Sequence, residues 1–362
     1  MSSSSSSSSS ANTAMLSKAQ EEADALPWIE KYRPQKLEDL VAHDEIVSTI
    51  RKLVDANRLP HLLFYGPPGT GKTSTILAVA REMYGANMRS MVLEMNASDA
   101  RGIDTVRNEI SNFAGTRKLF STGIKLVILD EADNMTRDAQ MALRRVIEKY
   151  ASNARFCIIC NYASKIIPAL QSRCTRFRFA PLKTELVVGR VKDIIDKEEL
   201  EITEDGLNAV LRLGEGDMRK VLNILQSSSL ANNRKVDEAA VYRCTGKPTE
   251  EDISACRNAL MEESVSEAFK VIRNLQVTKG LALVDILHSL HDELKSVKFP
   301  PSMRVHLLKH MSEIEFNLAS GTSETLQLGA LVGAFFLARK KMQDATNKKS
   351  SSSAPMEIST FA

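Results

Sequence analysis

The first half of the chain alternates short apolar runs with longer amphipathic segments. Five runs of bulky or β-branched apolar residues occur, at 61–65, 92–95, 125–129, 155–160 and 177–179. Helical patterns separate them, and the clearest of these covers residues 72–83. Short apolar runs that alternate with helices are typical of a parallel sheet buried beneath crossover helices. We therefore expect an α/β domain, with a parallel sheet and flanking helices, over residues 26–182.

Strand patterns fade in the second half, where amphipathic helices dominate. The pattern predicts three helices, at 184–198, 203–213 and 217–225, and then a long helical block up to residue 342. One helical face of that block carries Leu283, Ile286, Leu287, Leu290 and Leu294. We interpret this stripe as core or as a helix-to-helix interface. A small helical domain at 183–247 and a second all-α domain at 248–342 are expected.

Both ends of the chain are rich in serine and poor in apolar residues. Residues 1–25 and 343–362 cannot bury enough apolar surface to offset the entropy of ordering, so we expect two disordered tails. Met1 is followed by nine serines rather than an apolar core, so no secretory signal is expected. The longest apolar run, 328–338, is 11 residues, whereas a membrane span needs about 20. We expect a soluble intracellular protein without membrane contact.

Composition narrows the possible chemistry. The chain has 48 Lys and Arg residues against 45 Asp and Glu, a net charge of +3, which argues against a polybasic protein that coats nucleic acid. Aromatic residues make up 5%, too few to suggest base-stacking platforms. The five cysteines form no disulfide framework and fit a reducing compartment. Cys157 and Cys160 have a zinc-like spacing but no second pair, so we interpret them as core thiols.

A phosphate-binding loop follows the first apolar run. Its eight residues match the Gly-x-x-x-x-Gly-Lys-Ser/Thr pattern and are Gly66, Pro67, Pro68, Gly69, Thr70, Gly71, Lys72 and Thr73. The glycines let backbone N–H groups turn toward a triphosphate, and the next helix adds its positive N-terminus. We expect Lys72 to reach the β- and γ-phosphates of ATP and Thr73 to ligate Mg²⁺.

The third apolar run ends in two carboxylates, Asp130 and Glu131. Asp130 is placed to hold Mg²⁺, directly or through water, and Glu131 to orient and deprotonate the attacking water. Adjacent carboxylates favour hydrolysis over transfer to another substrate, because a kinase must exclude water. The sequence therefore predicts an ATP hydrolase.

Three more polar residues stand at informative positions. Asn161 follows the fourth run, at the sheet edge where the γ-phosphate would lie. Arg219 begins a helix of the small domain and could reach back to the nucleotide. Arg173 is a loop arginine whose catalytic role would need a partner subunit. Taken alone, Asn161 and Arg219 are each more typical of surface polar groups than of a nucleotide site.

These motifs occur in the order found in the AAA+ clamp loaders, and the chain resembles a small subunit of replication factor C over residues 26–342. The motifs that carry the resemblance are Trp28 to Pro34 (WIEKYRP), the loop 66–73, Asp130 to Asp133 (DEAD), Asn161, Ser172 to Cys174 (SRC) and Gly216 to Arg219 (GDMR). The resemblance implies an AAA+ P-loop ATPase domain, a helical lid and an all-α collar.

The resemblance also implies a function. Clamp loaders are hetero-pentamers, so it implies four other replication factor C subunits, the sliding clamp PCNA and primer–template DNA as partners, and the nucleus as location. ATP binding would drive assembly on clamp and DNA, and hydrolysis would release them. Two alternatives remain: a nucleotide-binding structural subunit without turnover, and another AAA+ remodelling machine.

The resemblance also implies roles for individual residues. Arg33 and Val41 would flank the adenine, Asn161 and Arg219 would be the first and second sensors, and Arg173 would act in the neighbouring subunit's site. Residues 96–103 (NASDARGI) resemble the start of a helix that faces DNA in this family, although Ala100 replaces an acidic residue. Arg101, and less strongly Arg107, would contact phosphates without reading base sequence.

Overall fold

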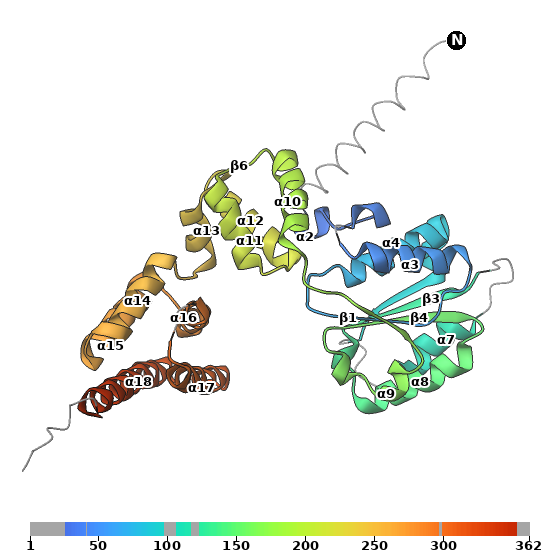
Figure 1. Ribbon diagram of the computed structural model, residues 1–362. Helices are drawn as coiled ribbons and strands as arrows, with labels where there is room; N and C mark the ends of the chain where they lie inside the picture. Colours follow the sequence, from blue (N-terminus) through green and yellow to red (C-terminus); the bar gives the residue numbers. More distant parts are fainter. Residues whose placement is uncertain (1–25, 41, 98–105, 117–122, 297–298, 353–362) are drawn as a thin grey trace, which may run out of the picture. The chain divides into compact units, whose positions relative to one another are not determined.

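A computed structural model describes residues 26–40, 42–97, 106–116, 123–296 and 299–352 (Figure 1). The chain divides into two compact units, Met1–Val241 and Tyr242–Ala362. The first unit contains the α/β domain together with a helical domain, and the second is entirely helical where it is described. Each unit is considered separately below.

Five parallel strands form the central sheet, in the order β2-β3-β4-β1-β5. The strands are β1 (Leu62–Tyr65), β2 (Val92–Asn96), β3 (Lys125–Asp130), β4 (Ala154–Cys160) and β5 (Thr175–Arg178). Each corresponds to one of the five predicted apolar runs. Parallel strands put all their carboxyl ends at one edge of the sheet, so the segments after β1, β3 and β4 lie close together.

Helices cover both faces of the sheet, as Figure 1 shows. One face carries α3 (Asp44–Asp55) and α4 (Lys72–Tyr84); the other carries α7 (Ser111–Gly115), α8 (Arg137–Tyr150) and α9 (Pro168–Gln171). β3 illustrates the alternation: Leu126 and Ile128 join the core under α4, whereas Val127 and Leu129 join the core under α8. Both faces are buried, which explains why this strand is apolar at nearly every position.

Several short elements lie between or beside the longer ones. They are α2 (Trp28–Lys31), η1 (Leu37–Asp39), η2 (Gly85–Asn87), α5 (Met88–Met91), the π-helical η3 (Val106–Ile110), η4 (Ala132–Asn134) and η5 (Ala163–Lys165).

The helical domain of the first unit, here called the lid, is built from α10 (Thr184–Glu198), α11 (Glu204–Gly214) and α12 (Met218–Ala231). The Asp217 side chain caps α12 by accepting from the backbone N–H groups of Arg219 and Lys220. Two short parallel strands, β6 (Glu201–Ile202) and β7 (Lys235–Val236), join the ends of these helices. The sequence did not indicate these strands, because two residues carry no readable alternation.

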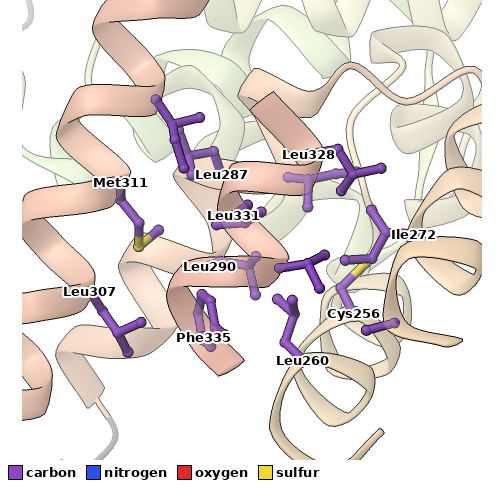
Figure 2. Close-up of a cluster of buried hydrophobic side chains, with 14 of the residues drawn as sticks. Cys256, Leu260, Ile272, Leu287, Leu290, Leu307, Met311, Leu328, Leu331 and Phe335 are labelled. Atoms are coloured by element: carbon purple, nitrogen blue, oxygen red, sulfur yellow. The ribbon is translucent and has the colours of Figure 1, made fainter. Parts of the chain in front are cut away.

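The second unit packs α14 (Glu250–Glu262), α15 (Val265–Lys279), α16 (Leu283–Ser296), α17 (Pro301–Ala319) and α18 (Glu324–Ser352) around one apolar core. Figure 2 shows side chains from all five helices meeting there, including Cys256, Ile272, Leu290, Met311 and Phe335. All five residues of the predicted stripe on α16 are buried in this core. Among the described helices, none is both long and apolar enough to cross a membrane.

Two features of the structure lie near predicted domain limits, which stay predictions. The division between the units falls inside α13 (Glu238–Thr245), before the predicted boundary at residue 247. The backbone of α18 continues to Ser352, beyond residue 343, where the sequence predicted a disordered tail to begin. Extending a formed helix costs much less than starting one, and Ala345 and the lysines that follow are compatible with it.

Candidate active site

The phosphate-binding loop connects the end of β1 to the start of α4. Gly66, Gly69 and Gly71 have φ angles of 146°, 66° and 92°, a region that side chains with a Cβ rarely adopt. A Cβ on Gly66 would lie 2.0 Å from the Phe179 carbonyl oxygen. Glycine is therefore required at this position by both backbone conformation and space.

Gly69 brings the loop against the lid. A Cβ added to Gly69 would lie 1.6 Å from Oδ1 of Asp217, the residue that caps α12. The Met218 backbone N–H also donates to the Gly69 carbonyl, at 3.4 Å. The loop thus touches the N-terminus of the helix that carries Arg219.

Lys72 is buried, with 7% of its surface exposed. Its Nζ donates to the carbonyl oxygens of Gly66 (2.8 Å) and Pro67 (2.7 Å) and to Oδ1 of Asn161 (3.2 Å). Burial lowers the pKa of Lys72, and the Asp130 carboxylate partly opposes this effect. A buried ammonium group held by neutral acceptors is well suited to bind an anionic phosphate.

The two predicted carboxylates lie at the end of β3. Thr73 Oγ1 donates to Oδ2 of Asp130 at 2.6 Å, and the Glu131 backbone N–H donates to Oδ1 of Asp130 at 2.8 Å. Glu131 has a φ of 54°, and its Oε2 accepts from Asn134 Nδ2 at 3.3 Å. The hydroxyl and carboxylate oxygens of Thr73 and Asp130 are hard ligands of the kind Mg²⁺ prefers, so the residues fit the expected cation.

A cavity at this edge of the sheet brings together most of the predicted nucleotide-binding residues. Those that line it are Arg33, Pro68, Gly69, Thr70, Gly71, Lys72, Thr73, Asp130, Glu131, Asn161 and Arg219. Gly66 and Pro67 form the start of the loop, and their carbonyl groups hold Lys72. The residues come from three sheet-edge segments, the lid and the N-terminal segment.

Arg173 lies apart from this cavity. Its guanidinium is 2.5 Å from Oε1 of Glu148 on α8 and donates to the Ala169 carbonyl at 2.6 Å. The side chain is 34% exposed and is not among the cavity-lining residues of the described chain. This placement is compatible with action on a neighbouring subunit.

Three predicted positions have no described side chain. Val41 and Arg101 lie outside the described residues, and Arg107 is described only through the backbone of η3. Their assignments stay predictions.

Several cavity residues were missed by sequence reasoning. Arg190 on α10 lines the cavity, and its Nη2 donates to the Tyr32 carbonyl at 3.4 Å. Ile29, Met218 and Leu222 add apolar surface. An arginine or a leucine in an amphipathic helix carries no distinguishing signal, so only the fold could place these residues.

The two cysteines with zinc-like spacing are buried on opposite faces of β4. Burial raises the pKa of the Cys160 thiol to about 12, so it stays protonated and is a poor metal ligand. Among the described residues, no group of three or more His, Cys, Asp or Glu side chains is arranged to hold a metal ion. The interpretation as core thiols is confirmed.

The parallel sheet, the loop with its lysine and the Asp-Glu pair define a P-loop ATPase with a helical lid. The family model for the ATPase family associated with various cellular activities (AAA) matches residues 62–182, which assigns the chain to that class of ATP hydrolases. A second family model, the replication factor C C-terminal domain, matches residues 248–334.

Curated relatives place the chain within this class. Replication factor C subunit 5 of Mus musculus and of Homo sapiens are each 56% identical to it over 315 residues, covering 87% of this chain and 93% and 92% of the relatives. Replication factor C subunit 3 of Schizosaccharomyces pombe is 51% identical, covering 85% of this chain and 90% of the relative. The chain belongs to the replication factor C small-subunit family.

A more distant likeness exists among solved structures. The Thermotoga maritima RuvB Holliday junction branch migration motor aligns with 75% of this chain and 93% of its own, at 13% identity and a TM-score of 0.48. A likeness at this level has no bearing on function.

Proposed function

We propose that this chain is an ATP-hydrolysing subunit of a clamp loader, active within a hetero-pentamer of replication factor C subunits. The complex would load the sliding clamp PCNA onto primer–template DNA in the nucleus, during replication and repair. The observation that best supports this proposal is the cluster of Lys72, Thr73, Asp130 and Glu131 at one edge of the sheet. It provides both a phosphate site and a base, which a purely structural subunit would not need.

Each side chain of the site has a separate role in ATP hydrolysis. Lys72 exchanges its carbonyl partners for phosphate oxygens, which are stronger acceptors because they are charged. Glu131 orients a water molecule and accepts its proton, while Asn161 positions the γ-phosphate and Arg219 approaches from the lid. Arg173 serves the site of the adjacent subunit.

Mg²⁺ would be held through Thr73 and Asp130, and when bound it neutralises developing charge on the phosphates. The Thr73–Asp130 hydrogen bond keeps both oxygens on the same side of the loop. Arg33 and Val41 would flank the adenine base. Arg101 and Arg107 would contact the DNA backbone in the central channel.

Lys72→Ala tests the assignment directly. Without its cation the loop should lose ATP binding at this site, which isothermal titration of the purified chain with Mg-ATP measures. Lys149→Ala, an exposed lysine beside Tyr150 on α8, is the matched control and should bind ATP normally. Unchanged ATP affinity in Lys72→Ala would contradict the proposed site.

A further inference from the structure

The N-terminal segment 27–34, here called the strap, contacts the lid rather than the sheet. The Trp28 backbone N–H donates to Oε1 of Gln226 on α12 at 3.1 Å. Glu198, the last residue of α10, accepts a short hydrogen bond from the Tyr32 hydroxyl and lies 2.7 Å from Nζ of Lys31. These contacts join residues 166 to 198 positions apart in sequence.

The Glu198 contacts are better protected than an ordinary surface ion pair. The Glu198 side chain is 17% exposed and that of Lys31 is 22% exposed. Trp28 is buried, and its ring meets the Tyr32 ring edge-on with centroids 6.4 Å apart. Charge-assisted hydrogen bonds with reduced solvent screening are the stronger kind, so Glu198 is the main polar anchor of the strap.

The strap also forms one wall of the nucleotide cavity. Its lining residues are Ile29, Glu30, Tyr32, Arg33 and Pro34. The loop and its charged side chains line the same cavity and suit phosphates. Ile29, Tyr32 and Pro34 give the strap apolar and aromatic surface, which suits a planar base, so we assign the strap to the base side of the cavity.

Beyond the strap the chain returns to the α/β domain. Leu37 is buried in the core under α4, together with Ile50 and Leu62. The strap is thus a second connection between lid and sheet, in addition to the chain segment that leads into α10.

We propose that Glu198 is a positioning residue that fixes the strap to the lid, so that the base-side wall of the cavity moves with the lid. Through the strap, binding of the base is then coupled to the position of the lid, whereas binding of the phosphates alone does not depend on Glu198. This inference rests on the proposed ATP site, and it adds a residue that touches neither base nor phosphate.

Two ligands separate the base contribution from the phosphate contribution: Mg-ATP and Mg-tripolyphosphate, which has no base. In the full-length chain, Glu198→Ala should weaken ATP binding by about 10-fold, the loss of roughly one charge-assisted interaction, and leave tripolyphosphate binding within about twofold. Glu198→Gln, which keeps an acceptor for Tyr32, should be intermediate. Glu201→Ala, an exposed lid carboxylate 3.0 Å from Lys235, is the control.

The chain has a single tryptophan, and it lies in the strap, so Trp28 emission reports strap release directly. In Glu198→Ala without ligand the emission should shift to longer wavelength, and in Glu201→Ala it should not. The inference requires both the shift and the selective loss of ATP affinity. Equal weakening of both ligands, an unchanged ATP affinity or an unchanged emission would overturn it.

Failure of the proposed function looks different. If the unmodified chain bound neither ligand, the ATP site itself would be rejected and the inference with it. If the unmodified chain bound ATP but Glu198→Ala showed no selective loss of ATP affinity, only the role of Glu198 would be rejected.

Discussion

Lys72 makes, within the folded chain, contacts that a triphosphate would replace. Two of its three acceptors are carbonyl groups of the loop itself, and the third is the Asn161 amide oxygen. The ammonium group is therefore satisfied although it is buried. In the proposed function, ATP would exchange these contacts for charged acceptors and would free Asn161 to face the γ-phosphate.

Glu131→Gln separates hydrolysis from binding. The amide cannot accept a proton from water, so turnover at this site should fall by about 10²- to 10⁴-fold while ATP binding persists. The measurement is single-turnover hydrolysis in the assembled complex with only this subunit altered. Glu82 is an exposed residue of α4 that pairs with Arg51 on α3, and Glu82→Gln should leave turnover unchanged. An unaltered rate in Glu131→Gln would favour the structural-subunit alternative.

Arg173→Ala tests action across a subunit boundary. Because Arg173 pairs with Glu148 away from the cavity, its loss should impair hydrolysis at a neighbour's site and leave ATP bound to this chain. Site-specific nucleotide cross-linking and turnover in the complex measure the two effects. A defect confined to this chain's own site would argue against the assignment in trans.

The meeting of Lys72, Asp130 and Asn161 could be predicted from the sequence, because parallel strands end at the same edge. The contributions of Arg190 and Tyr32 could not. They depend on how the lid and the strap fold back over the loop, and such long-range packing leaves no local pattern.

At the scale of elements, the central strands β1, β3 and β4 could be predicted because burial on both faces makes them almost continuously apolar. The edge strands β2 and β5 are partly exposed, but they keep enough bulky apolar residues to be recognised. The strands β6 and β7 could not be predicted, since each is two residues long. Some helix starts have a local signal in the sequence. Thr136, Asp217, Thr249 and Ser264 each cap a helix N-terminus through a side-chain oxygen. Polar side chains at these positions satisfy backbone groups and thereby fix where the helices begin.

Asp252 links two helices of the second unit. It forms a capping box with Thr249 at the start of α14, and its Oδ1 lies 2.6 Å from Nζ of Lys279 at the end of α15. Burial alone would raise the pKa of Asp252, but the hydrogen bonds from Lys279 and Thr249 outweigh it and hold that pKa below the ordinary value for an aspartate. The carboxylate form is therefore the one that stabilises the fold.

Asp252→Asn should lower the free energy of unfolding of the second unit by about 1 to 3 kcal/mol at neutral pH. A lowered folded-state pKa gives stability that is fully present above the unfolded value and is lost as pH falls through the folded value. The difference between the variant and the unmodified chain should thus shrink below about pH 4. Denaturant unfolding of the full chain across pH 3 to 7 measures it.

Asp292→Asn is the control for that experiment, because Asp292 pairs with Lys295 at 2.8 Å but is 73% exposed. Exposed pairs contribute little, so this variant should change stability by less than about 1 kcal/mol. Equal losses in both variants, or a loss in Asp252→Asn that persists at low pH, would contradict the role given to the carboxylate.

At the scale of the whole molecule, the net charge of +3 agrees with the proposal that the chain meets DNA only as part of an assembly. In a ring around DNA, each subunit needs only a few groups that face phosphates. The proposal assigns two such groups, Arg101 and Arg107, to this chain. Near neutrality is therefore compatible with DNA binding by the complex.

The salt dependence of DNA binding tests this distribution. Each phosphate contact contributes about −0.9 to the slope of log K against log salt, so this chain alone should show a slope no steeper than about −1.8. The assembled complex should be several-fold steeper. Replacing both arginines by alanine should reduce the slope of the complex by about 1.8, as fluorescence anisotropy with a primer–template duplex would measure. A steep slope for the isolated chain would contradict the shared-channel arrangement.

The alternation along β3 restricts the kinds of genetic change that this protein can accept. Successive residues of the strand belong to different cores, and the strand ends on Asp130. Deleting or inserting one codon within β3 would shift the following residues by one position. Side chains of each core would then point into the other, and Asp130 would turn away from Thr73. A conservative substitution changes the packing of one side chain in one core. A single-codon change in length disturbs the packing of both cores and the Asp130–Thr73 contact together. We therefore expect variation in β3 to occur in residue identity and not in length.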